Sequence, residues 1–395
     1  MNRNTVPEFR KKPELQHLQI QLTVYTVFAV LCTLAGAVLI GKTWSSENAL
    51  RWGVIAGIVL VYQVLFIGRR LRNNHRLDEV VLLPTFGLGN SLTMLRGVLF
   101  AWTAGFLFLP RPRSYLAWAP AVLYTTSLAL DLGDGYAARM RNHATRLGAA
   151  LDTEWDALGL LVAVSLAVWY RTLPVWFLPI GAARYAFMFG IWLRNRQGLL
   201  VYPLPDSSSR RPIAGLTMGF TSAMLWPIVS PPGSILAGII FLIPFAASFL
   251  RDWLVVSGTL DPQSRGYRRL LSCIRTFLYV WVPLVLRIYL ALVVGVKIKQ
   301  WLDSPTDPYV NSPFPFTLAV LMLALGAAAL VLGIGGRFTA FVLIFPLGFA
   351  ILEVGLQPVL AISLLGTLAI LLLGTGKYSL WEPEKKLFGR HWGVR

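Results

Sequence analysis

Residues 131–156 read DLGDGYAARMRNHATRLGAALDTEWD and hold five of the chain's 18 acidic residues. Apolar runs flank this stretch on both sides, at residues 114–133 and 148–170. Each run is close to the roughly 20 residues that an α-helix needs to cross a bilayer. The acids are therefore predicted to lie at the ends of two membrane-spanning helices, where an unpaired charge is costly.

The remainder of the 395-residue chain has the same apolar character. It is 56% hydrophobic and only 14% charged. Apolar runs recur along it, whereas a β-barrel would show short segments of alternating polarity. We therefore predict an all-α fold, a polytopic membrane bundle of about 12 transmembrane helices. The predicted spans are residues 19–41, 52–68, 92–110, 114–133, 148–170, 173–193, 213–230, 233–250, 276–297, 314–333, 338–355 and 358–375.

The net charge of +18 arises from basic clusters between the predicted spans. Cytoplasmic loops of membrane proteins collect Lys and Arg, so the charge predicts topology and not nucleic-acid binding. Alternation of the spans places the clusters at 69–76, 139–146, 194–211 and 251–275 on one side of the membrane. Both termini and the acidic stretch then lie in the cytoplasm.

Composition divides the chain into three predicted parts. Residues 1–75 form an N-terminal extension with two spans, and residues 76–258 form six spans around the acidic stretch. Residues 259–395 form four further spans. The two cysteines, Cys32 and Cys273, imply neither a disulfide framework nor a thiolate metal site.

The spacing of the acids predicts a cation site. Asp131 and Asp134 share one helix face, and Gly148, Asp152 and Asp156 form a stripe along the next helix. If these two helices are neighbours, four carboxylates converge and repel one another. Divalent cations remove that repulsion, and oxygen-only ligands suit Mg²⁺, Mn²⁺ or Ca²⁺.

Small and basic residues accompany the carboxylates. Gly135, Ala138 and Gly148 leave room beside them, although close helix packing explains small residues equally well. Arg139 follows Gly135 by one helical turn, where its side chain could hold phosphate oxygens. Metals, a cleft and an arginine together are the parts of a two-metal centre for phosphoryl transfer.

This stretch resembles the signature of the CDP-alcohol phosphotransferase (CDP-alcohol phosphatidyltransferase) family, D-x2-D-G-x2-A-R-x8-G-x3-D-x3-D. The matching positions are Asp131, Asp134, Gly135, Ala138, Arg139, Gly148, Asp152 and Asp156. The resemblance extends over about residues 85–255 through the six-span layout. It implies an enzyme of phospholipid biosynthesis that transfers a phosphoalcohol, typically phosphatidyl, group from a CDP-alcohol such as CDP-diacylglycerol to an acceptor alcohol and releases CMP.

The resemblance also implies residue roles, two divalent ions (Mg²⁺ or Mn²⁺) and a homodimer in a bacterial inner (plasma) membrane. The implied metal ligands are Asp131, Asp134, Asp152 and Asp156. Asp156 would complete the metal site, act as general base toward the acceptor hydroxyl, or do both. The implied contacts to the CDP-alcohol are Asp131, Gly135, Ala138, Arg139 and Gly148.

A second match lies upstream, where residues 89–97 read GNSLTMLRG. They resemble the N-x-L-T-x-x-R pattern that precedes the first core span in this family, through Asn90, Thr93 and Arg96. The resemblance implies that Asn90 and Thr93 help to bind the donor phosphate or close the cleft. Capping of a helix at the membrane interface is the alternative.

Three arginines are predicted to bind a phosphate on the acceptor. Arg184 lies in the middle of a predicted span, where an ionisable residue is a functional candidate. Arg210 and Arg211 precede the next span, where the positive-inside rule is an equal explanation. The three favour glycerol 3-phosphate or an inositol phosphate over serine or choline. Glu154 is interpreted as a solvated loop charge.

The C-terminal part carries a separate resemblance. Segments 329–340 and 371–383 resemble the DoxX family of four-helix membrane proteins, through Gly333, Gly336, Arg337, Gly374, Gly376 and Ser379. That resemblance leaves a quinone-linked redox subunit as one alternative, although the chain lacks paired ligands for haem or iron–sulfur. An ion-coupled transporter is another, although no repeat is visible.

Overall fold

The computed structural model describes residues 13–79, 81–140, 144–205, 210–229, 231–303, 314–355, 357–376 and 378–381. These residues form helices and contain no β-strand, which confirms the predicted all-α class. Within these described ranges, five helical stretches are long and apolar enough to cross a membrane. They are Pro13–Thr43, Ser46–Asn73, Val175–Arg196, Gly233–Val256 and Arg265–Val296.

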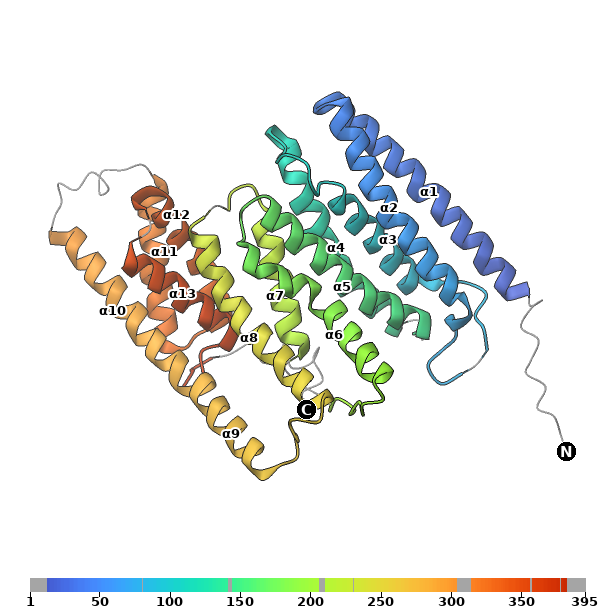
Figure 1. The fold of residues 1–395 in the computed structure, drawn as a ribbon. Coiled ribbons are helices and arrows are strands. Elements are labelled where there is room, and N and C mark those ends of the chain that lie inside the picture. The colour runs from blue at the N-terminus through green and yellow to red at the C-terminus, as the bar shows by residue number, and fades with distance from the viewer. Residues whose placement is uncertain are drawn as a thin grey trace. The chain divides into compact units, whose positions relative to one another are not determined.

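Each predicted span overlaps at least one helix, and the span predicted at 276–297 covers the end of α9, the π-helical turn Phe277–Trp281 and most of α10. The run of helices can be followed by colour in Figure 1. The helices are α1 (Pro13–Thr43), α2 (Ser46–Arg70), α3 (Gly87–Ala104), α4 (Ala119–Met140), α5 (Arg146–Trp169), α6 (Leu178–Arg196), α7 (Arg210–Leu225), α8 (Gly233–Val256), α9 (Arg265–Thr276), α10 (Val282–Asp303), α11 (Phe314–Leu332), α12 (Gly336–Val354) and α13 (Pro358–Leu373). Helix α4 extends beyond the apolar run that ends at residue 133. Asp131 and Asp134 therefore lie within a helix and not at its end.

The chain separates into two compact units. The first comprises residues 1–186 and 218–229, and the second comprises residues 187–217 and 230–395. The three-part division predicted from composition stays a prediction.

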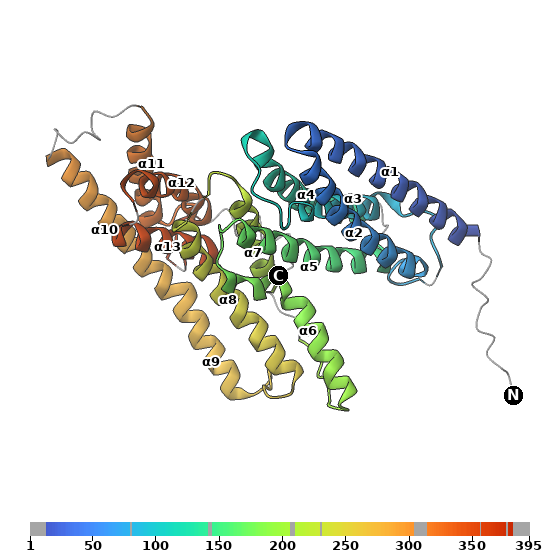
Figure 2. The same ribbon diagram turned by 45° about the horizontal axis from the view of Figure 1, so that its top comes forward.

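In the first unit, α1 and α2 form a hairpin that lies beside α3 in both Figure 1 and Figure 2. Its apolar contact joins Ala29 and Leu60 to Val98 and Ala101 of α3. Buried hydrogen bonds add to it, because the Gln63 side chain donates to the Gly97 carbonyl at 2.8 Å. Packing and interhelical hydrogen bonds are what associate helices in lipid. The N-terminal hairpin therefore supports α3, the helix that holds Arg96.

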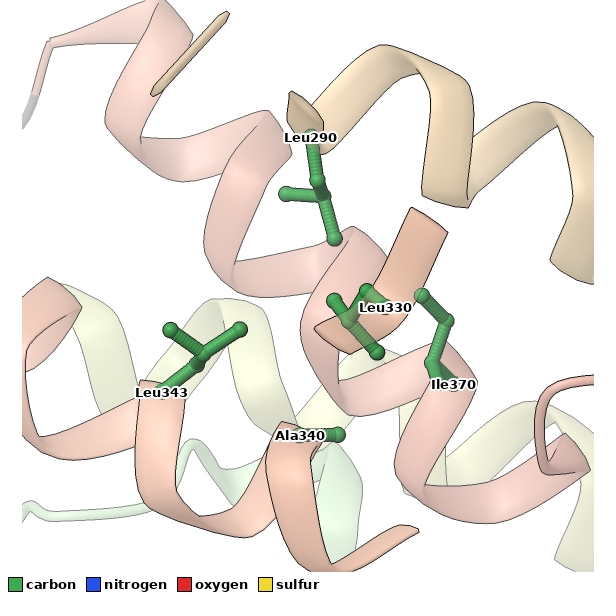
Figure 3. Packing of buried hydrophobic residues seen from close by; sticks show 5 residues of the cluster. All are labelled: Leu290, Leu330, Ala340, Leu343 and Ile370. Carbon is green, nitrogen blue, oxygen red and sulfur yellow. The ribbon is translucent and has the colours of Figure 1, made fainter. Parts of the chain in front are cut away.

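The second unit has its own core, drawn in Figure 3. Its buried residues come from α10 to α13 and are Leu290, Leu330, Ala340, Leu343 and Ile370. The buried Arg287 guanidinium donates to main-chain carbonyls of Leu330, Val331, Thr375 and Tyr378. A Cβ on Gly333 would lie 2.9 Å from Arg287 Nη2, and the φ of Gly333 is +67°. Packing thus requires this glycine of the DoxX-like pattern, and the DoxX resemblance itself stays a prediction.

Candidate functional site

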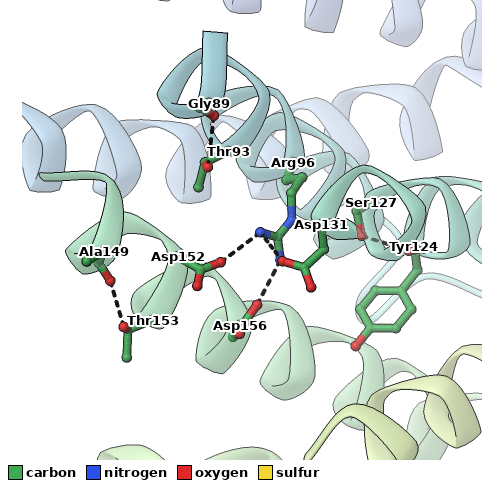
Figure 4. A network of polar contacts seen from close by, with 10 residues as sticks. All are labelled: Gly89, Thr93, Arg96, Tyr124, Ser127, Asp131, Ala149, Asp152, Thr153 and Asp156. Atoms are coloured by element: carbon green, nitrogen blue, oxygen red, sulfur yellow. Dashed lines mark hydrogen bonds and ion pairs between the residues drawn. The ribbon is translucent and has the colours of Figure 1, made fainter. Parts of the chain in front are cut away.

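Three of the four predicted aspartates converge in the first unit, as Figure 4 shows. Asp131 comes from α4, and Asp152 and Asp156 come from one face of α5. One carboxylate oxygen of each lies within 4.8 Å of the others. Asp134 belongs to α4, but its side chain lies outside the described residues. The same holds for the other predicted donor-binding positions in α4, which are Gly135, Ala138 and Arg139.

The centre of this carboxylate cluster is Arg96 of α3, whose side chain is fully buried. Its Nη1 lies 2.5 Å from Asp131 Oδ1 and 2.9 Å from Asp152 Oδ1. Its Nη2 lies 2.8 Å from Asp156 Oδ1. The three carboxylates are between 34% and 49% exposed, so Arg96 closes the inner side of the cluster and the outer side is open.

Arg96 matched the upstream pattern in the sequence, but sequence reasoning assigned it no role. A signal was available, because carboxylates that are partly withdrawn from water require a cationic or hydrogen-bonding partner. What the sequence did not show is which arginine supplies it. That choice follows from α3 packing against both α4 and α5.

The described residues fit a divalent cation. All the donor atoms are carboxylate oxygens, the ligands that Mg²⁺, Mn²⁺ and Ca²⁺ prefer. Metal–oxygen distances of about 2.0–2.6 Å place opposite ligands of one ion up to about 5 Å apart. The carboxylate oxygens of the three aspartates, all within 4.8 Å of one another, are close enough for this. One guanidinium faces three carboxylates, so an excess of negative charge remains for a cation.

The N-terminal ends of α3 and α5 are joined beside this cluster. The buried Asn90 side chain donates to Asn74 Oδ1 at 3.1 Å and to Thr145 Oγ1 at 3.0 Å. Thr145 is the N-cap of α5 and accepts from the Gly148 amide at 2.9 Å. A Cβ on Gly148 would lie 2.3 Å from Asn90 Oδ1, so this position requires glycine.

The structure thus gives Asn90 and Gly148 a packing role at the α3–α5 junction. Thr93 is also buried, and its hydroxyl donates to the Gly89 carbonyl at 3.1 Å. The roles of these three residues in donor binding stay predictions.

The three predicted acceptor arginines occupy different environments. Arg184 is half-buried in the part of α6 that belongs to the first unit. Arg210 belongs to the second unit, where its Nε lies 2.8 Å from Asp252 Oδ2 of α8. Arg251 also contacts Asp252, at 2.9 Å. The side chain of Arg211 lies outside the described residues. Acceptor binding by these arginines stays a prediction.

The interpretation of Glu154 as a solvated loop charge is wrong. Glu154 lies within α5 and is only 9% exposed. Its Oε1 accepts hydrogen bonds from the Tyr62 hydroxyl of α2 at 2.6 Å and the Tyr185 hydroxyl of α6 at 3.0 Å. The two tyrosines satisfy a carboxylate that burial would otherwise penalise, and the cluster joins three helices of the first unit.

Replacing this carboxylate should destabilise the first unit. We expect Glu154→Leu to cost about 1–3 kcal/mol, because it leaves two tyrosine hydroxyls without their acceptor. Glu154→Gln keeps an acceptor oxygen and should lose less. Thermal unfolding of the purified protein in detergent measures both. Combining Tyr62→Phe with Glu154→Leu should add little further loss, and a Glu154→Leu protein as stable as wild type would contradict the assignment.

Comparisons with known proteins match part of the chain. Residues 86–256 match the family model described as CDP-alcohol phosphatidyltransferase. Similar curated proteins include the CDP-diacylglycerol--glycerol-3-phosphate 3-phosphatidyltransferases of Salmonella choleraesuis (strain SC-B67) and Salmonella typhi. Each is 32% identical over 97 residues, covering 22% of this chain and 50% of the relative. The chain thus spans about half the length of the curated relatives it matches. No solved structure matches the chain.

Proposed function

Because residues 86–256 match the family model of the CDP-alcohol phosphatidyltransferases, we propose that this membrane protein transfers the phosphatidyl group of CDP-diacylglycerol to glycerol 3-phosphate. The observation that carries the proposal is the convergence of Asp131, Asp152 and Asp156 on one buried arginine. The names of the curated relatives support this donor and this acceptor. The products would be CMP and a phosphatidylglycerol phosphate.

The proposed reaction is a displacement at phosphorus. The acceptor hydroxyl oxygen forms a bond to the phosphorus attached to diacylglycerol, and the bond from that phosphorus to the bridging oxygen of CMP breaks. The Asp156 carboxylate accepts the hydroxyl proton. Arg96 Nη2, at 2.8 Å, holds that carboxylate in place. Divalent ions bound by Asp131, Asp152 and Asp156, with Asp134 as fourth ligand, would stabilise negative charge on the diphosphate.

The remaining predicted residues are assigned to the two substrates. We propose that the CDP-alcohol is contacted by Asn90, Thr93, Gly135, Ala138, Arg139 and Gly148. The acceptor phosphate would be bound by Arg184, Arg210 and Arg211, since guanidinium groups bind phosphate through charge-assisted hydrogen bonds. We place the site at the cytoplasmic face of a bacterial inner membrane and propose a homodimer, as the family resemblance implies.

An acceptor panel tests this function. Purified protein in detergent receives CDP-diacylglycerol, Mn²⁺ or Mg²⁺, and one of glycerol 3-phosphate, inositol phosphate, serine or choline, and CMP release is followed. We expect the fastest release with glycerol 3-phosphate and little without divalent ions. Fastest release with another acceptor would reject the proposed substrate, and no CMP with any acceptor would reject the transferase. Cation flux into proteoliposomes without CMP release would favour the transporter alternative.

A further inference from the structure

Helix α9 separates its charged and apolar residues onto opposite faces. At 3.6 residues per turn its four arginines fall within about one third of the circumference. They are Arg265, Arg268, Arg269 and Arg275. The opposite face carries Tyr267, Leu270, Leu271 and Ile274. No residue of α9 is buried, and Leu270 and Ile274 are 57% and 43% exposed. The described protein therefore leaves this apolar face uncovered.

The helical run that contains α9 is too long for the hydrocarbon core of a bilayer. It continues through a π-helical turn at Phe277–Trp281 into α10, as Figure 1 and Figure 2 show in orange. At 1.5 Å per residue, residues 265–303 span about 58 Å, against a hydrocarbon thickness of roughly 30 Å. Part of this run must therefore lie outside the hydrocarbon.

Aromatic side chains show where the hydrocarbon ends. Phe277, Tyr279 and Trp281 are exposed on the π-turn, and Tyr and Trp concentrate at membrane–water interfaces. The apolar run begins at the same point, so α10 lies on the hydrocarbon side of the turn and α9 on the headgroup side. Figure 1 and Figure 2 show α9 and α10 along one line, so docking of α9 in the plane of the membrane surface requires a bend between them. The π-turn and Pro283, which has no N–H for the Tyr279 carbonyl, are where such a bend is expected.

We propose that α9 is an interfacial helix that binds the anionic phospholipids of the membrane surface. Its arginines lie among the headgroup phosphates, and its apolar face lies against the acyl chains. An anionic surface is the expected binding partner, because α9 contains four arginines and no acidic residue. The positive-inside rule explains basic residues in this region but does not require their separation from leucines. The proposal does not depend on the transferase activity.

The sequence provides a probe for this test, because Cys273 is exposed on α9 and Cys32 is the only other cysteine. In the full-length Cys32→Ser protein, an environment-sensitive fluorophore on Cys273 reports the surroundings of α9. We compare vesicles of phosphatidylcholine with vesicles of equal phosphatidylcholine and phosphatidylglycerol. In the mixed vesicles we expect emission at shorter wavelength and weaker quenching by aqueous acrylamide. Each Arg→Gln substitution in α9 should weaken docking about fivefold.

Two controls separate lipid binding from other causes. Lys299→Gln removes one exposed charge near the far end of α10 and should leave the spectrum unchanged, whereas Arg269→Gln should not. High salt should reverse docking, whereas dilute inorganic phosphate should not. Equal quenching in the two kinds of vesicle would overturn the proposal, whether α9 then lies in water or against a second copy of the chain. A protein with all four arginines replaced that still responds to phosphatidylglycerol would also overturn it.

Discussion

Asp156→Asn is expected to slow CMP release by about 10²–10⁴-fold while the protein stays folded. The asparagine keeps an oxygen that can accept from Arg96 Nη2, which lies 2.8 Å from the aspartate. It cannot take the proton of an acceptor hydroxyl at neutral pH, and it is a weaker ligand for a hard cation. Initial rates of CMP release from CDP-diacylglycerol at saturating glycerol 3-phosphate measure the effect.

The dependence on Mn²⁺ distinguishes the two roles proposed for Asp156. If Asp156 holds the ion, the Mn²⁺ concentration for half-maximal activity should rise in the asparagine variant. If it acts only as the base, kcat should fall at an unchanged Mn²⁺ dependence. Thr153→Ala is the matched control, because Thr153 is exposed on the same helix and donates to the Ala149 carbonyl at 2.7 Å. An asparagine variant within a few-fold of wild-type activity would refute both roles.

The helices were largely predictable because lipid permits few backbone conformations. A chain crossing the hydrocarbon must satisfy its own hydrogen bonds, so a long apolar run predicts a helix almost without regard to tertiary context. The shared face of Asp152 and Asp156 follows from helical periodicity alone. Hydropathy does not predict the parts of a helix that continue beyond an apolar run. Hydropathy therefore ended the fourth span at residue 133, whereas α4 continues to Met140.

The contacts of the site were less predictable, because they join residues distant in the sequence. Glu154 obtains its hydroxyl partners from Tyr62 and Tyr185, which lie 92 and 31 positions away. A single sequence does not show which helices are neighbours. The sequence does show that Glu154, two residues after Asp152, faces the other side of the helix. A carboxylate packed there against other helices needs a hydrogen-bonding partner. That reasoning predicts a partner for Glu154 without identifying it.

The same limit applies to Arg96, whose importance depends on the N-terminal hairpin as well as on α4 and α5. The Gln63 side chain of α2 bonds to the carbonyl of Gly97, the neighbour of Arg96. The Tyr25 hydroxyl of α1 donates to the Met94 carbonyl at 3.0 Å. These bonds fix the stretch of α3 that presents the guanidinium to the carboxylates. The two N-terminal helices, which had no function assigned from sequence, thus contribute to the geometry of the site.

Arg96→Gln is expected to destabilise the first unit by about 3 kcal/mol and to make its stability depend on divalent ions. Removing one partner of a buried ion pair typically costs about 3–5 kcal/mol. We expect the lower end, because the three carboxylates are 34–49% exposed and water screens part of their repulsion. With the guanidinium gone, a bound cation would be the main source of positive charge among the described members of the cluster. Thermal unfolding in detergent, with Mn²⁺ and with EDTA, measures this dependence.

The test compares how far EDTA lowers the melting temperature of each variant. EDTA should lower the melting temperature of Arg96→Gln more than that of wild type. Arg96→Lys should be intermediate, since one ammonium cannot bridge three carboxylates as a guanidinium does. Arg111→Gln removes another arginine of the first unit, one that contacts the Trp226 carbonyl and the Tyr170 ring, and should respond to EDTA as wild type does. If EDTA lowers the melting temperature of Arg96→Gln and of wild type equally, the idea that Arg96 and a bound cation together neutralise the aspartates is wrong.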